Sequence, residues 1–333
     1  MTASPATPLS ALDLVPVSEG RSVGQGLRDA TALARRLEAA GYARVWYAEH
    51  HNTEAFAASA TAVLMGQALA ATSRIRVGSG GIMLPNHVPL TVAESFGTLE
   101  QLYPGRVELG LGRAPGTDMR TALALRRGQG GHDTFVQDVR QLLRYFGDQQ
   151  GEPIRAAVAR DTRVPLWILG SSTGGAQVAA ALGLPYVFAS HFAPAMLLDA
   201  LALYRETFDA AAPSATVAAP HVMVAANVMA APTEAEARRL FTTHQLMVRD
   251  MARNTRGPLQ PPVDRVELTP AEAAALEQHL AVCAVGSPEQ VADQLEQIVE
   301  LTRADELMLT SYAHDPELRA RSFELTARAW AAS

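Results

Sequence analysis

The sequence predicts a single (β/α)8 TIM barrel over residues 1–333, with insertions and with its active site at the carboxyl ends of the strands. Short apolar segments alternate with segments of helical periodicity, which is typical of parallel strands joined by helical crossovers. Eight such units follow one another within 333 residues, a length typical of this barrel. No linker interrupts the alternation, so we expect one domain. A doubly wound open sheet is the competing fold, but the first predicted strand lacks the Gly-x-Gly-x-x-Gly helix start of that fold.

The predicted strands are short and apolar, and several of them end in glycine, serine or charged residues. They span residues 12–17, 44–51, 74–85, 106–112, 165–170, 185–190, 221–229 and 305–310. After the first of them, Gly20, Gly24 and Gly26 indicate a turn. The strand over 221–229 is almost entirely apolar, as expected for a strand that is buried on both faces.

The predicted helices place leucine, alanine and other apolar residues at helical spacing. They span residues 27–40, 59–72, 90–102, 135–146, 176–182, 195–208, 233–245, 287–302 and 316–332. Ser287, with Gln290 three positions later, forms a capping box at the start of one of them. Residues 250–275 contain four prolines and are predicted to form an irregular insertion or a mobile loop.

The composition excludes several classes of function. The net charge of −6 and the isoelectric point near 5.9 argue against nucleic acid or an anionic membrane as a partner. All 28 basic residues are arginine, which excludes an active-site Schiff base, pyridoxal chemistry and a Walker-type phosphate lysine. Cys283 is the only cysteine, so no disulfide within the chain is expected. Because the start does not resemble a signal peptide and no long apolar run occurs, we expect a cytoplasmic protein.

Three glycines interrupt the predicted strand over 74–85. Gly78, Gly80 and Gly81 lack the side chains that normally pack a strand, and each adds to the backbone entropy lost on folding. In one interpretation, a flat ring lies against the bare main chain at this point. In the other, the segment is a buried strand that glycine has softened. The segment by itself does not distinguish between the two.

Titratable residues gather at the end of the second predicted strand, at Glu49, His50 and His51. Neighbouring side chains on a strand point to opposite faces, so the two histidines are not expected to share a ligand. A metal site would need further ligands, for which His191 and Asp315 are candidates, but no His-x-His or paired acidic motif accompanies them. The other interpretations are a structural histidine packed under a helix and a general base above a bound cofactor.

A junction between a strand and a helix offers a site for an anion. Residues 170–175 read Gly-Ser-Ser-Thr-Gly-Gly and lead directly into the helix over 176–182. Free amides at the start of a helix, its dipole and the serine hydroxyls would hold a phosphate without lysine. Arg113 would add a bidentate contact. An ordinary serine N-cap, with glycine for tight packing, is the alternative interpretation.

Several stretches, taken in order, resemble the bacterial luciferase-like flavin-dependent monooxygenase family. They are VWYAEHH at 45–51, VGSGGIMLP at 77–85, PGRVELGLGR at 104–113, and LGSS at 169–172 followed by AALGLPY at 180–186. Each motif by itself is modest, but the ordered set is specific. The likeness spans most of the chain and is weakest over 114–165 and 245–285.

The resemblance implies a barrel that binds reduced FMN, with no metal, at the carboxyl ends of the strands. The catalytic histidine of the family matches His50, which Glu49 precedes, and its non-proline cis peptide behind the isoalloxazine ring matches Gly80–Gly81. The cofactor-binding residues implied in this way are Ser79, Gly80, Gly81, Arg113, Gly170, Ser171, Ser172 and Gly175. Gly175 stands where a hydroxyl residue is usual, so its phosphate contact is limited to the main-chain amide. Gly112 stands where the luciferases proper have a reactive cysteine, which argues against light emission.

The implied reaction is a monooxygenation of a small to medium organic substrate. Reduced FMN from a separate flavin reductase would react with O2 to form a C4a-peroxyflavin, which oxygenates the substrate. On the same fold, the alternative is an 8-hydroxy-5-deazaflavin-dependent oxidoreductase, which transfers hydride without inserting oxygen. A metal-dependent amidohydrolase barrel and a flavin-storage protein are the alternatives from other classes. Since the family pairs through the region of residues 59–72 and 90–102, we also expect a homodimer.

Overall fold

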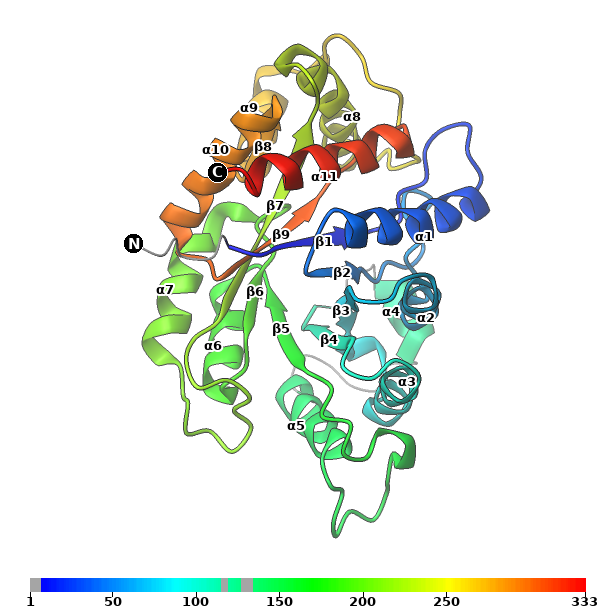
Figure 1. Cartoon of the computed structure of the whole chain (residues 1–333), viewed down its shortest axis with the longest axis vertical. Helices are drawn as coiled ribbons and strands as arrows, with labels where there is room; N and C mark the ends of the chain where they lie inside the picture. Colours follow the sequence, from blue (N-terminus) through cyan, green and yellow to red (C-terminus); the bar gives the residue numbers. More distant parts are fainter. Residues whose placement is uncertain (1–6, 115–118, 127–133) are drawn as a thin grey trace.

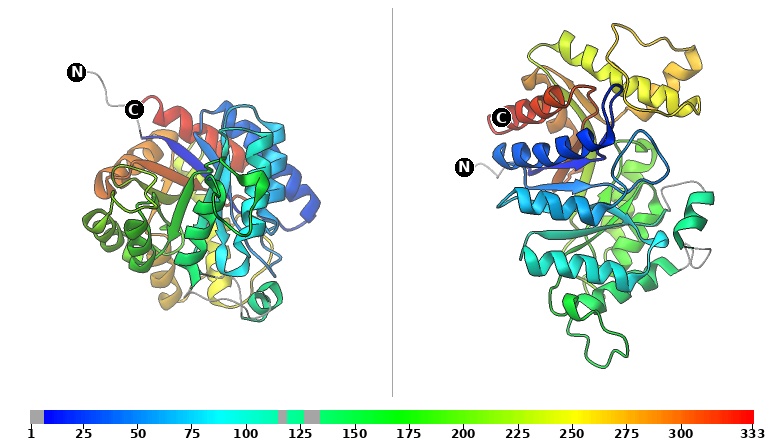
Figure 2. Two further views of the ribbon diagram at one scale, coloured as in Figure 1. Left: turned by 90° about the horizontal axis from the view of Figure 1, so that it is seen from below. Right: turned by 90° about the vertical axis from the view of Figure 1, so that its right-hand side faces the viewer.

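The computed structural model describes residues 7–114, 119–126 and 134–333. Within these residues, nine parallel strands form one sheet, and eight of them close into a barrel surrounded by helices (Figure 1, Figure 2). The barrel strands are β1 (Leu9–Asp13), β2 (Arg44–Tyr47), β3 (Arg76–Met83), β4 (Val107–Gly112), β5 (Leu166–Gly170), β6 (Tyr186–Phe188), β7 (Val222–Ala230) and β9 (Glu306–Thr310). Pairing of β1 with β9, of β9 with β7 and of β7 with β6 closes the ring. The predicted (β/α)8 fold is confirmed.

Helices connect the strands on the outside of the barrel. They are α1 (Val23–Ala39), α2 (Thr61–Ala71), α3 (Pro89–Leu102), α4 (Met119–Arg126), α5 (Phe135–Phe146), α6 (Thr173–Leu182), α7 (Leu197–Thr207), α8 (Glu234–Ala252), α9 (Pro270–His279), α10 (Pro288–Thr302) and α11 (Pro316–Trp330). Five apolar residues keep helical spacing in α1. Four of them, Ala30, Leu33, Ala34 and Leu37, are buried, and Leu27 is partly buried. Among the described helices, none combines the length and the apolar character that crossing a membrane requires.

The first strand lies earlier in the chain than predicted. The prediction over 12–17 followed the apolar run, but β1 occupies Leu9–Asp13. Asp13 ends the strand because its carboxylate accepts a hydrogen bond of 2.7 Å from the amide of Val15. Val15 then adopts a φ of 52°, in the left-handed region that a strand does not use. The predicted turn through Gly24 and Gly26 is also wrong, because both glycines lie within α1.

The region predicted to be irregular, 250–275, contains regular structure. The helix α8 continues to Ala252, seven residues beyond its predicted end at 245, and α9 begins at Pro270. A ninth strand, β8 (Cys283–Gly286), was not predicted and pairs with the last residues of β7, outside the closed ring. This extension of β7 carries α8 and α9 to one side of the barrel mouth.

Buried charges fill the barrel interior beneath the site. The guanidinium of Arg44 lies 3.0 Å from the carboxylate of Glu306 and 3.5 Å from that of Glu108, and it stacks 4.8 Å from the ring of Trp167. The indole nitrogen of Trp46 donates to Glu108 over 2.8 Å. Because every partner in this network is buried, the Trp46 ring is held in one orientation under β3.

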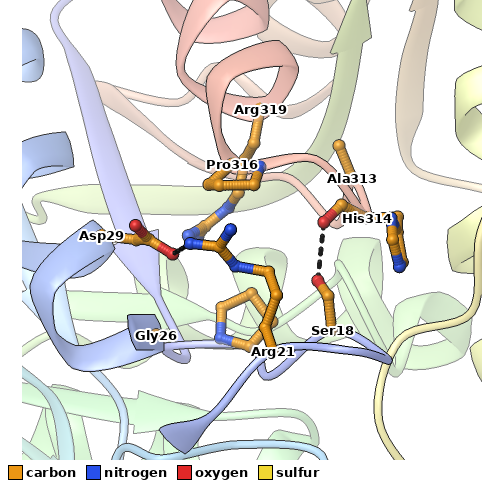
Figure 3. A pocket seen from close by; sticks show the side chains of 9 residues that line it. Ser18, Arg21, Gly26, Asp29, Ala313, His314, Pro316 and Arg319 are labelled. Carbon is orange, nitrogen blue, oxygen red and sulfur yellow. Dashed lines mark hydrogen bonds and ion pairs between the residues drawn. The ribbon is translucent and has the colours of Figure 1, made fainter. Parts of the chain in front are cut away.

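The loops that follow β1 and β9 are tied together at the rim of the barrel (Figure 3). The hydroxyl of Ser18 donates to the carbonyl oxygen of His314 over 2.7 Å. Nearby, Arg319 of α11 donates to the carboxylate of Asp13 over 2.8 Å, with both side chains buried. These contacts fix the two loops against each other beside the site.

Candidate active site

A cavity of about 470 Å³ lies at the carboxyl ends of the barrel strands, where the active site is expected. Eight of the predicted site residues line it, and these are His50, Gly80, Gly81, Arg113, Gly170, Ser171, Ser172 and Gly175. Glu49 and Ser79 are buried beside the cavity and do not line it. The residues that the sequence predicted at the ends of β2 to β5 therefore make up most of the described cavity lining on that side of the barrel.

The glycines of β3 leave room for neighbouring groups. The peptide Gly80–Gly81 is cis, at the position that the resemblance implied. A β carbon on Gly80 would lie 2.6 Å from the Leu12 side chain, and one on Gly81 would lie 2.8 Å from the carbonyl oxygen of Gly110. On Gly78, a β carbon would lie 2.5 Å from the indole nitrogen of Trp46. Gly78 thus serves packing in the barrel, whereas Gly80 and Gly81 also form the bare wall of the cavity.

Ser79 belongs to the sheet and not to the cavity lining. Its hydroxyl donates to the carbonyl oxygen of Gly110 over 2.9 Å and accepts from the amide of the same residue over 3.0 Å. These two bonds join β3 to β4 just before the register between the strands shifts. The hydroxyl stabilises the irregular glycine segment from behind.

The loop between β5 and α6 forms the polar end of the cavity. Ser172 is the N-cap of α6 by its backbone, but its side chain makes no capping hydrogen bond, contrary to the ordinary N-cap interpretation. The guanidinium of Arg113 lies against the start of the helix, since a β carbon on Gly174 would lie 2.7 Å from Nη2. The arrangement brings a cation, the serine hydroxyls and the amides at the positive end of a ten-residue helix to one place.

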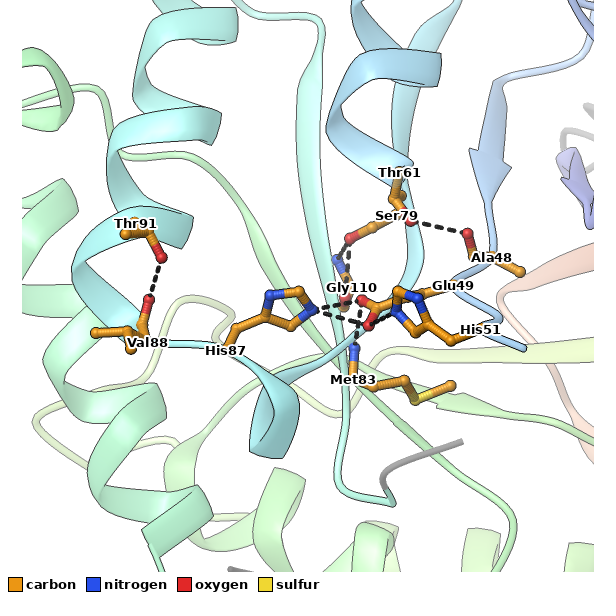
Figure 4. Close-up of polar contacts among 10 residues, drawn as sticks. All are labelled: Ala48, Glu49, His51, Thr61, Ser79, Met83, His87, Val88, Thr91 and Gly110. Carbon is orange, nitrogen blue, oxygen red and sulfur yellow. Dashed lines mark hydrogen bonds and ion pairs between the residues drawn. The ribbon is translucent and has the colours of Figure 1, made fainter. Parts of the chain in front are cut away.

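Glu49 holds two histidines and a main-chain amide together (Figure 4). Its carboxylate lies 2.9 Å from Nε2 of His51 and 2.8 Å from Nε2 of His87, and it accepts from the amide of Met83 over 3.0 Å. Burial by itself raises the pKa of Glu49, but these hydrogen bonds outweigh it and lower the pKa to about 2. Glu49 therefore links the end of β2 to the segment that follows β3, and a direct catalytic role for it stays a prediction.

His50 points into the cavity, away from its two neighbours in the sequence. Its ring centroid lies 5.3 Å from that of Phe56, and Nδ1 is buried with no hydrogen-bond partner among the described residues. Burial lowers the pKa of His50, and the charge of Glu49 only partly offsets this, so the ring is neutral near pH 7. His50, Phe56, Met247 and Met251 also border a second, open cleft, which adjoins the cavity.

Three further histidines line the cavity, and sequence reasoning identified only one of them. His191 follows β6 and had been considered as a metal ligand, whereas His244 on α8 and His279 on α9 were missed. No motif marks these two positions, because α8 and α9 are brought to the cavity by the extension of β7. In the part of the chain that the structure describes, no three His, Cys, Asp or Glu side chains are placed to hold a metal ion. Asp315 instead caps α11.

Comparison with known proteins identifies the family. Residues 8–305 match the model of the luciferase-like monooxygenases. A luciferase-like monooxygenase of Escherichia coli (strain K12) is 45% identical over 320 residues, which cover 95% of this chain and 95% of that protein. The chain belongs to the luciferase-like monooxygenase family. An N-acetyl-S-alkylcysteine monooxygenase of Bacillus subtilis (strain 168) is 35% identical to it over 243 residues, 71% of this chain and 72% of the relative.

Solved structures place this luciferase-like monooxygenase among enzymes of the same fold. The crystal structure of apo-MsnO8 has a TM-score of 0.90 and 34% identity, and the match covers 98% of this chain and 99% of that one. The oxygenating constituent of 3,6-diketocamphane monooxygenase from Pseudomonas putida, in complex with FMN, has a TM-score of 0.68 and 17% identity over 98% and 99% of the two chains. An F420-dependent secondary alcohol dehydrogenase has a TM-score of 0.67 and 17% identity over 97% and 99%. The last two show the fold alone, and they bind different cofactors.

Proposed function

We propose that this enzyme uses reduced FMN, supplied by a separate flavin reductase, and O2 to oxygenate a small to medium organic substrate. One observation carries the proposal, namely that a single cavity joins the bare wall at Gly80–Gly81 to the anion site formed by Arg113 and the start of α6. A flat ring with a phosphate at the end of a chain has this shape and charge. The FMN bound to the diketocamphane monooxygenase supports the assignment, since that protein shares the fold.

The residues present fit FMN at both ends. Because β carbons at Gly80 and Gly81 would collide with Leu12 and with the main chain of Gly110, only main chain is available to a ring at this wall. At the other end, Arg113 supplies a planar cation, and Ser171 and Ser172 line the same space. Bound reduced FMN would supply the electrons that activate O2.

The chain itself would position the reactants, exclude water and move a proton. Apolar side chains, among them Leu14, Met247 and Met308, make up most of the cavity wall and limit the access of water. His50 is neutral and lines this wall, and its Nδ1 has no partner among the described residues, so the ring is able to exchange a proton with a bound molecule. Glu49 would position His50 by holding His51 and the segment after β3.

The proposal is tested by oxygen incorporation. The purified protein, FMN, NADH and a flavin reductase are incubated under 18O2 with candidate substrates, beginning with a simple ketone. An N-acetyl-S-alkylcysteine, which carries a carboxylate, is the charged comparison. We expect one 18O atom in the product and none when FMN is left out. The same protein is titrated with FMN and with an 8-hydroxy-5-deazaflavin. Tight binding of the deazaflavin without FMN binding, together with anaerobic hydride transfer, would contradict the proposal in favour of the deazaflavin oxidoreductase.

A further inference from the structure

Among the described residues, four histidines line the cavity at the carboxyl ends of the strands. They reach it from separate segments, with His50 after β2, His191 after β6, His244 on α8 and His279 on α9. His50 is assigned above to proton exchange. His191 and His244 have no part in the proposed handling of FMN, although both are almost completely buried.

The ring of His191 is held in place but lacks a hydrogen bond. His191 is 8% exposed, and its ring lies 5.0 Å from that of Phe192 at a near-perpendicular angle. The main-chain carbonyl oxygen of His191 accepts a hydrogen bond of 2.7 Å from the side-chain amide of Asn227. Within the described residues, Nδ1 of His191 has no partner. A buried ring nitrogen without a partner is destabilising unless a bound molecule supplies the missing hydrogen bond. Because His191 lines the cavity, a molecule bound there is placed to supply the hydrogen bond that the ring lacks.

His244 is packed as firmly as His191. The side chain is 2% exposed, and its ring lies 4.5 Å from that of Tyr312 and 5.3 Å from that of Phe241. Burial, with a smaller contribution from the charge of a protonated His279, lowers the pKa of both His191 and His244 to about 3, so both rings are neutral near pH 7. Neutral imidazoles offer one donor and one acceptor each, and no charge.

The rest of this part of the cavity is apolar. Phe56, Met247, Met308 and Tyr312 share the wall with the histidines. Among the described residues that line the cavity, Arg113 bears the only full charge, and it lies at the start of α6. An ionised group held among these side chains would lose its hydration, and the nearest charged side chains on this side, Asp250 and Arg256, line the adjoining cleft and not the cavity.

We propose that His191 and His244 recognise the substrate, and that the substrate is a neutral molecule with an apolar body and one hydrogen-bonding group, such as a carbonyl. This inference rests on the proposed function, because it takes the wall at Gly80–Gly81 and Arg113 to be occupied by the cofactor. The imidazoles hydrogen bond to the polar group, and the methionine and aromatic side chains contact the apolar body.

The test compares four probes of similar size by calorimetry on the FMN-loaded protein, with oxidised flavin and no reductant. Acetophenone carries a carbonyl, ethylbenzene lacks it, and benzoate and benzylammonium carry opposite charges. We expect acetophenone to bind at least tenfold more tightly than either ion and severalfold more tightly than ethylbenzene. Equal or tighter binding of benzoate or benzylammonium would overturn the inference.

Substitutions separate the hydrogen bond from packing. In His191→Phe and His244→Phe we expect acetophenone binding to weaken about twofold to tenfold, because the loss of one hydrogen bond usually weakens binding by this factor. Ethylbenzene binding should stay within about twofold of the parent. The control is His314→Phe, a histidine outside the cavity, which should change neither. Loss of both probes together, or of neither, contradicts a recognition role. FMN affinity reports whether each variant is folded. If His191→Phe does not fold, His191→Gln replaces it in the test; this variant keeps a hydrogen-bonding group and should retain acetophenone binding.

The design separates this inference from the proposed function. Probe binding needs neither a reductase nor O2, so a failure to oxygenate substrates does not affect it. If FMN does not bind at all, the proposed function fails. Titrations of the two uncharged probes, acetophenone and ethylbenzene, on the cofactor-free parent, His191→Phe and His244→Phe proteins still measure what the two histidines contribute, because Arg113 attracts neither probe.

Discussion

Replacement of Arg113 by alanine tests the phosphate site directly. The guanidinium lies at the start of α6, close enough that a β carbon on Gly174 would lie 2.7 Å from Nη2 and 3.0 Å from Nη1. A charge-assisted hydrogen bond in such a place contributes about 1.5–3 kcal/mol. At about 1.4 kcal/mol per tenfold change, Arg113→Ala should weaken FMN binding about tenfold to a hundredfold.

Riboflavin, which lacks the phosphate, is the matched ligand. It should bind Arg113→Ala and the parent protein about equally, as measured by the quenching of flavin fluorescence. His50→Ala is the matched variant, since it should leave FMN affinity nearly unchanged and lower turnover. Gly174→Ala should weaken FMN binding by less than Arg113→Ala, because the added β carbon displaces the guanidinium without removing its charge. If Arg113→Ala loses riboflavin as severely as FMN, the arginine is structural and the phosphate lies elsewhere.

Three further predictions concern the fold and its assembly. Gly81→Ala should lower the thermal unfolding temperature and abolish FMN binding, because its β carbon would lie 2.8 Å from the main-chain carbonyl oxygen of Gly110, which is fixed in β4. An unchanged melting curve would refute this. Glu49→Gln should destabilise the protein at pH 7 by about 2 kcal/mol in urea. Since folding lowers the Glu49 pKa from 4.5 to about 2, the stability that its charge contributes is present above pH 4.5 and is lost as the pH falls towards 2, so parent and variant should converge there. Light scattering should report a homodimer. Val63 on α2 and Leu102 on α3 are 72% and 65% exposed, and replacing either by arginine should give monomers. A monomeric parent would contradict this prediction.

The residues just after β2 show how far the sequence could predict the site. The strand predicted over 44–51 ends at Tyr47, but His50 and His51 still point in different directions, as expected, because His50 lines the cavity while His51 turns back to Glu49. That rule is local and needs only the extended backbone. It could not identify His87 as the second partner of Glu49, because that contact depends on how the segment after β3 folds against β2.

The helix α9, which was not predicted, begins with a local sequence signal for a helix start. Ser287 with Gln290 was recognised as a capping box, and the structure has it. Thr269 with Glu272 is the same motif, with Pro270 at the first helical position, where proline is favoured. The four prolines of residues 250–275 predict irregular structure, but one of them, Pro270, marks the start of α9.

The distribution of charge along the cavity connects the two proposals. Of the described lining residues, Arg113 bears the only full charge, and it stands with the helix start that would hold the FMN phosphate. A carboxylate on the substrate would be attracted to the same guanidinium and would compete with the cofactor. Neutral imidazoles at His191 and His244 avoid that competition, because they offer hydrogen bonds without attracting an anion. The low pKa values of these two histidines therefore favour occupation of the cavity by cofactor and substrate together, each at its own end.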